Sequence, residues 1–113
     1  MTTLAYCVSF FFAARIREVA RRSNAALIQS DSGPLVEETL RAHADLVLLE
    51  IERVDLAEVE RVKAHPALRG VRVVGFGAHV EEQLFARARQ AGCDAVFTKG
   101  ELARRLAELF AGT

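Results

Sequence analysis

The amino-acid sequence predicts an open, three-layer α/β fold in which helices cover both faces of a five-stranded parallel sheet. Short apolar runs alternate with amphipathic segments along the whole chain, starting near residues 4, 25, 45, 71 and 94. Strands that alternate with helices form a parallel sheet with right-handed crossovers. The chain has 113 residues, which suits one domain over 1–113, whereas an eight-stranded barrel needs about twice as many.

The first half of the chain contains three of the expected strands and two of the helices. Consecutive apolar residues predict strands over 4–8, 25–28 and 46–49. A helix is expected over 11–22, where apolar residues recur at helical spacing. A second helix opens at Gly33 and Pro34, because proline in a first turn has no amide to leave unpaired.

The second half continues the alternation with three helices and two strands. Asp55 is expected to cap a helix that Pro66 ends. Gly92 is a natural left-handed end for the following helix. The remaining elements are a strand over 71–76, that helix over 80–91, a strand over 95–97 and a last helix over 101–110.

Composition excludes several functional classes. The 15 basic and 15 acidic residues give a net charge of zero, which argues against nucleic acid or an anionic membrane as the partner. No apolar stretch approaches the roughly 20 residues of a membrane span, and the first residues do not resemble a signal peptide. We therefore expect a cytoplasmic protein. Cys7 and Cys93 are expected to be free thiols, since two such residues form no disulfide framework.

The most informative feature for function is the run from Ala44 to Glu50, in which apolar residues end at one acid. A buried parallel strand with this pattern delivers a carboxyl group to the carboxyl-terminal edge of the sheet. Ligands of open α/β sheets bind at that edge. Glu50 is therefore the first candidate for a functional residue.

Three segments resemble the receiver domains of bacterial response regulators: residues 45–50, 62–68 and, most specifically, 91–99. The resemblance extends over nearly the whole chain and implies a flavodoxin-like sheet with strand order 2-1-3-4-5, which the spacing alone leaves open. It places Glu50 where the family has its phosphoacceptor aspartate. It places Lys99 at the invariant lysine of the fifth strand.

Four other family positions are changed in this chain. Ser9 and Phe10 stand where two acids help to hold Mg²⁺, Gly77 stands where a hydroxyl contacts the phosphoryl group, and Val96 replaces the aromatic residue of the conformational switch. Mg²⁺ is usually held by carboxylates, which Ser9 and Phe10 do not supply. Glutamate also moves the acceptor oxygen outward by about a bond length, and a misplacement of about 1 Å can cost ~100-fold in rate. We therefore predict a degenerate receiver, or pseudo-receiver, with no metal and no cofactor.

The surviving acid and base are expected to meet. Glu50 and Lys99 are predicted to form an ion pair, which either mimics the phosphorylated acid or only satisfies a lysine near the core. The run Phe10-Phe11-Phe12 cannot point inward at every residue, and we expect one ring to plug the mouth of the pocket. The sequence also places His79 at the carboxyl-terminal edge of the sheet, where it could enter a site.

A partner surface is predicted on the last two helices. In the receiver family this region is the usual contact and dimer face, and an apolar ring on a charged face often marks a contact. The candidate residues are Phe85, Arg87, Arg89, Arg104 and Arg105.

The leading functional hypothesis is a stand-alone degenerate receiver that acts in bacterial signal transduction by protein–protein interaction and is not an enzyme. The partner would be a signalling kinase or an output protein of a two-component system; a homodimer remains open. A first alternative is an atypical receiver that still accepts a phosphoryl group in a phosphorelay. A second is a small nucleotide- or flavin-binding protein, against which the bulky residues 10–12 argue because they stand where a phosphate loop would lie.

Overall fold

Five parallel strands form one sheet in the order β2-β1-β3-β4-β5 in the computed structural model, which describes residues 1–78 and 80–112. The strands are β1 (Thr2–Tyr6), β2 (Ala26–Ser30), β3 (Leu46–Glu50), β4 (Arg72–Gly77) and β5 (Ala95–Thr98). The helices are α1 (Phe10–Arg22), α2 (Leu35–Ala42), α3 (Ala57–Ala64), α4 (Glu82–Ala91) and α5 (Lys99–Phe110), with short turns η1 (Ile51–Arg53) and η2 (Pro66–Leu68). The predicted fold class and the strand order implied by the family resemblance are both confirmed.

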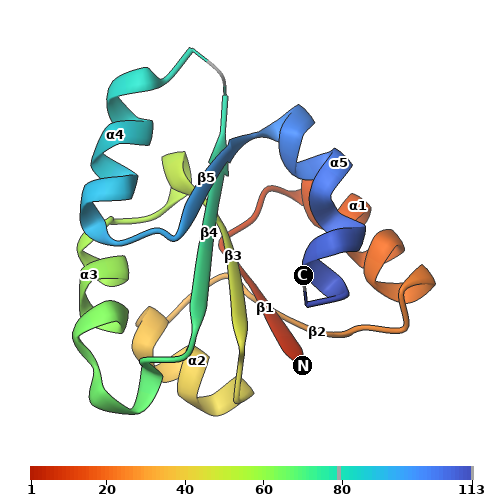
Figure 1. Cartoon of the computed structure of the whole chain (residues 1–113), viewed down its shortest axis with the longest axis horizontal. Coiled ribbons are helices and arrows are strands. Elements are labelled where there is room, and N and C mark those ends of the chain that lie inside the picture. The colour runs from red at the N-terminus through yellow and green to blue at the C-terminus, as the bar shows by residue number, and fades with distance from the viewer. Residues whose placement is uncertain (79, 113) are drawn as a thin grey trace.

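The helices form two layers around the sheet. Helices α1 and α5 cover one face, and α2, α3 and α4 cover the other (Figure 1). Every residue of the central strand β3 is buried, because its side chains enter both layers alternately. Val47 and Leu49 join the core under α2 to α4, whereas Leu46 and Leu48 join the core under α1 and α5. This burial explains why the strand carries a continuous apolar run.

Helix α5 begins two residues earlier than the sequence indicated. The Thr98 hydroxyl accepts a hydrogen bond from the Glu101 amide at 3.1 Å, and the Glu101 carboxylate accepts one from the Thr98 amide at 2.8 Å. This reciprocal capping box fixes the start of the helix. As a result, Lys99 is the first residue of α5 and lies directly after the end of β5. Gly92 ends α4 with a φ of 117°, as predicted.

Phe85 does not lie on a charged surface, which corrects the reason for including it in the partner face. It is 9% exposed and packs in the core beside Ala88, one helical turn along α4. These two residues form the buried side of α4. Because its ring is already covered within the chain, Phe85 gives no support to a contact surface.

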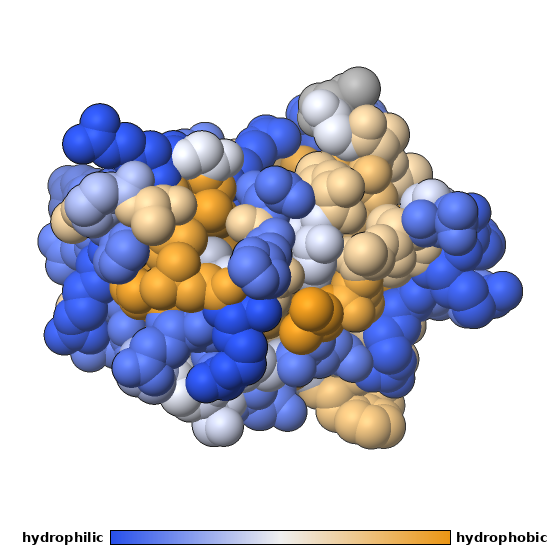
Figure 2. Space-filling model, turned by 90° about the horizontal axis from the view of Figure 1, so that it is seen from below, coloured by the Kyte–Doolittle hydropathy of each residue, from blue (hydrophilic) through white to orange (hydrophobic). Residues whose placement is uncertain are grey.

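The two ends of the sheet differ. The carboxyl ends of the strands point toward the top of Figure 1, where α4 and α5 begin. Figure 2 views the opposite end, where apolar side chains gather between polar ones. A hollow of about 310 Å³ opens at that end beside Leu40, Ala44, Leu68 and Val71. In the described part of the chain, no helix combines the length and the apolar content needed to cross a membrane.

Candidate functional site at the carboxyl ends of the strands

Glu50 and Lys99 meet at the carboxyl end of the sheet, as the sequence predicted. Their ammonium nitrogen and carboxylate oxygen Oε2 lie 3.3 Å apart. The other oxygen, Oε1, accepts a hydrogen bond from the Ser9 amide at 2.9 Å. Glu50 is only 4% exposed, whereas the Lys99 side chain is 45% exposed. Both oxygens of the buried acid therefore have partners inside the chain, while the lysine reaches solvent.

The surroundings of Glu50 favour its ionised form. Burial raises the pKa of this carboxyl group, but hydrogen bonding from Ser9 and the contact with Lys99 lower it by more. The net effect is a pKa below the usual value for glutamate. Glu50 is thus held as an anion by the loop after β1 and by the first residue of α5.

The phenylalanine run divides its rings between the core and the surface. Phe12 stacks on Phe76 of β4 with ring centroids 4.7 Å apart. Phe10 and Phe11 are strongly exposed, so neither fills the space of a metal site. Phe12, which is half-buried, lines a hollow beside Lys99, so the expectation that one ring plugs the mouth of the pocket stays a prediction. The sequence could not assign the rings to their sides, because the choice depends on where α1 begins.

Glu52 is a site residue that the sequence analysis missed. Its Oε2 accepts a hydrogen bond from the Ala78 amide at 2.8 Å. A Cβ atom added at Gly77 would lie 2.7 Å from Glu52 Oε1 and 3.0 Å from Ile51 Cγ1. The glycine therefore leaves the room that Glu52 occupies. The acid stands two residues after Glu50, which is the one sequence signal that could have drawn attention to it.

Val96 and Arg53 complete the description of this edge of the sheet. Val96 is buried in the core under α2 to α4 and presents no ring. Arg53 donates a hydrogen bond from Nε to the Cys7 carbonyl at 3.0 Å, which ties η1 to the loop after β1. The hydrogen bonds that join the loops at this edge thus include those from Ser9 to Glu50, from Ala78 to Glu52 and from Arg53 to Cys7.

The residues present do not fit a magnesium site of the receiver type. Ser9 and Phe10 bring no carboxylate, and both Glu50 oxygens are already engaged. Among residues 1–78 and 80–112, no group of three or more His, Cys, Asp or Glu side chains is placed to hold a metal ion. His79 lies outside the described residues.

The arginines of the predicted partner face have different neighbours. Arg87 lines a hollow between α3 and α4, together with Asp55 and Glu60. Arg104 lines a hollow between α1 and α5. Arg105 lies over the Phe97 ring at 5.3 Å, and Arg89 is exposed on α4. The structure therefore does not gather these side chains around one exposed ring.

Solved structures similar to this one are receiver domains of response regulators. A response regulator from Hahella chejuensis has a TM-score of 0.81 and 19% identity, over 98% of this chain and 93% of that one. A receiver domain from Rhodospirillum rubrum has a TM-score of 0.77 and 20% identity, over 100% and 95%. The phosphorylated cyanobacterial phytochrome response regulator RcpA has a TM-score of 0.75 and 18% identity, over 98% and 89%.

No family model matches the sequence, and no curated protein is similar enough in sequence to match it. The likeness to the solved structures is therefore one of fold. This chain has the five-stranded, flavodoxin-like fold of receiver domains along its whole length.

Proposed function

We propose that this chain is a degenerate receiver that acts in signalling by binding another protein, without standard magnesium-dependent phosphorylation. The receiver fold supports a role in signalling. The observation that carries the proposal is the state of Glu50, which is buried and bonded at both oxygens to groups of its own chain. A nucleophilic oxygen must be free to reach phosphorus and needs positive charge to stabilise the transition state.

The surroundings of Glu50 supply little of what phosphoryl transfer requires. Lys99 is the one cation in contact with Glu50 among the described residues, and its charge is already used by the carboxylate. The Ala78 amide, at the end of β4, is bonded to Glu52. An incoming phosphoryl group would have to displace both acids from these donors, and no metal would help to neutralise its charge.

The decisive experiment uses a small-molecule phosphoryl donor with Mg²⁺ and intact mass spectrometry. An active receiver domain treated in parallel shows that the donor works. We expect no stable mass increase in this protein. A phosphoryl adduct that Glu50→Gln abolishes would overturn the proposal and establish the atypical phosphoacceptor instead.

A further inference from the structure

Phe10 and Phe11 are the two most exposed large apolar side chains of the described residues, at 77% and 88%. Their rings touch each other nearly at right angles, with centroids 5.8 Å apart. Phe12 already supplies the ring that packs into the core. Two adjacent aromatic rings in water serve no purpose in the fold of the chain, and such patches commonly mark contact sites.

A hollow of about 480 Å³ opens beside Phe11, between the first turns of α1 and α5. Its apolar wall is formed by Phe11, Phe12 and Ala103, and its cations are Arg15, Lys99 and Arg104. Within the described residues, neither Arg15 nor Arg104 takes part in an ion pair, and Lys99 is half exposed although it contacts Glu50. The charge of Lys99 is balanced by Glu50, so the hollow combines an apolar wall with the positive charge of Arg15 and Arg104, which is available to a ligand.

We propose that Phe10, Phe11, Arg15 and Arg104, here called the aromatic-basic surface, bind an acidic segment of a partner protein. The segment would place one apolar side chain against Phe11 and carboxylates against the cations. This inference rests on the proposed function, because it names the chemistry of the partner that a binding module requires.

Charge argues against the other occupants. In a two-fold contact between copies of this chain, the same surface meets itself, so Arg15 and Arg104 would face like charges. An anionic lipid surface would attract the cations, but it would make no use of a hollow between two helices. A protein segment satisfies both the hollow and the charge.

The test measures the binding of the full chain to synthetic peptides of one length and four compositions: acidic with a leucine or phenylalanine anchor, acidic without an anchor, basic with an anchor, and neutral with an anchor. We expect only the first class to bind, with an affinity that falls as salt is added. Phe11→Ser and Arg104→Glu should each weaken binding by about tenfold or more. Both side chains are exposed, so the unfolding midpoint should change little.

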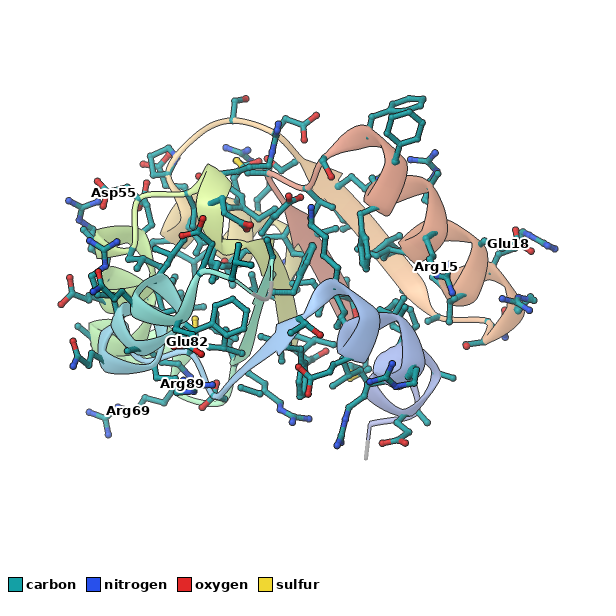
Figure 3. All side chains as sticks on the ribbon, turned by 90° about the horizontal axis from the view of Figure 1, so that it is seen from above. Arg15, Glu18, Asp55, Arg69, Glu82 and Arg89 are labelled. Atoms are coloured by element: carbon teal, nitrogen blue, oxygen red, sulfur yellow. The ribbon has the colours of Figure 1, made fainter. Side chains whose placement is uncertain are left out.

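Arg89→Glu is the matched control, because it reverses an exposed arginine on α4. Figure 3 labels Arg15 and Arg89 on helices that lie on opposite sides of the sheet. Binding should be unchanged in this variant. If Arg89→Glu weakened binding as much as Arg104→Glu does, the effect would be one of net charge alone, and the proposed surface would be overturned.

Three further results would overturn the inference: no peptide class binds, anionic vesicles bind while the peptides do not, or the chain self-associates in sedimentation and Phe11→Ser abolishes it. Each can occur with Glu50 unphosphorylated, so the proposed function would survive them. A phosphoryl adduct on Glu50 would instead overturn the proposed function, whatever the peptides do.

Discussion

Replacing Glu50 by glutamine tests the geometry of the site most directly, because glutamine keeps the shape of the side chain and removes its charge. Glu50 is 4% exposed and has two partners, the Ser9 amide at 2.9 Å and Lys99 at 3.3 Å. Glutamine can still accept the hydrogen bond from Ser9 through its amide oxygen. Its NH₂ group would then face the Lys99 ammonium, where it meets another donor.

The magnitude follows from these contacts. A hydrogen bond to a charged group contributes about 1.5–3 kcal/mol and a neutral one about 0.5–1.5 kcal/mol, so the Ser9 bond should weaken by about 1 kcal/mol. The pair with Lys99 adds less than about 1 kcal/mol, because the lysine is half exposed and solvent screens it. Burying a neutral side chain costs less desolvation free energy than burying a charged one, which offsets part of the loss. We expect Glu50→Gln to destabilise the fold by about 1–2 kcal/mol at pH 7.

The effect should depend on pH in one direction. The folded state lowers the pKa of Glu50, so the carboxylate stabilises the fold at pH values above the unfolded pKa of about 4.3. This contribution is lost as the pH falls through the lower, folded pKa. The difference in free energy of unfolding between the two proteins should therefore be constant above about pH 5 and shrink in more acidic solution.

Urea unfolding followed by circular dichroism at pH 7, 5 and 3 measures the difference. Glu37→Gln, which removes an exposed glutamate on α2, is the control and should change the free energy of unfolding by less than about 0.5 kcal/mol. If Glu50→Gln were as stable as the parent at pH 7, or if the difference persisted unchanged at pH 3, the charged contacts of Glu50 would not stabilise the fold.

Three other substitutions test the surroundings of the site. Gly77→Ala places a methyl group 2.7 Å from Glu52 Oε1, so urea unfolding should show a loss of about 1–2 kcal/mol; in a Glu52→Ala background the loss should be smaller, and equal losses would contradict the contact. Thr98→Ala removes the cap of α5 and should cost about 1 kcal/mol, whereas Thr98→Ser should retain most of the stability in thermal melts. Gly92→Ala combines a φ of 117° with a Cβ only 2.7 Å from Lys63 Cγ, and it should lose about 1 kcal/mol or more; an unchanged midpoint would refute the strain at this turn.

The fold could be predicted because each strand run is local and strongly apolar. The five strands, their parallel direction and the approximate helices all follow from alternation. Strand order is not a local property, and it rested on the family resemblance. The start of α5 was misplaced because Thr98 belongs at once to the strand pattern and to the capping box with Glu101. Hydrophobic periodicity does not reveal a helix cap that overlaps the end of a strand.

Site residues could be predicted only where a sequence motif matched this chain to the receiver family. Glu50 and Lys99 were matched to positions that meet in receivers, and they meet here. Glu52 was missed because its partner, the Ala78 amide, is 26 residues away in sequence. Phe85 was placed on the wrong side of α4, since one ring among charged residues does not reveal which face is covered. Long-range contacts and side-chain direction need the folded backbone.

Gly77 and Glu52 should be considered together. Considered alone, Gly77 only lacks the hydroxyl group that the family resemblance implies at this position. In the structure, the missing side chain makes room for the Glu52 carboxylate, which binds the amide of the next residue. Glu50 likewise fills the positions around Ser9 and Lys99. Buried or partly buried donors are stabilised by such acceptors. We therefore interpret this edge of the sheet as one at which the chain's own carboxylates satisfy the hydrogen-bond donors. Restoring a hydroxyl at residue 77 alone would therefore displace Glu52 before it created a place for a phosphoryl group.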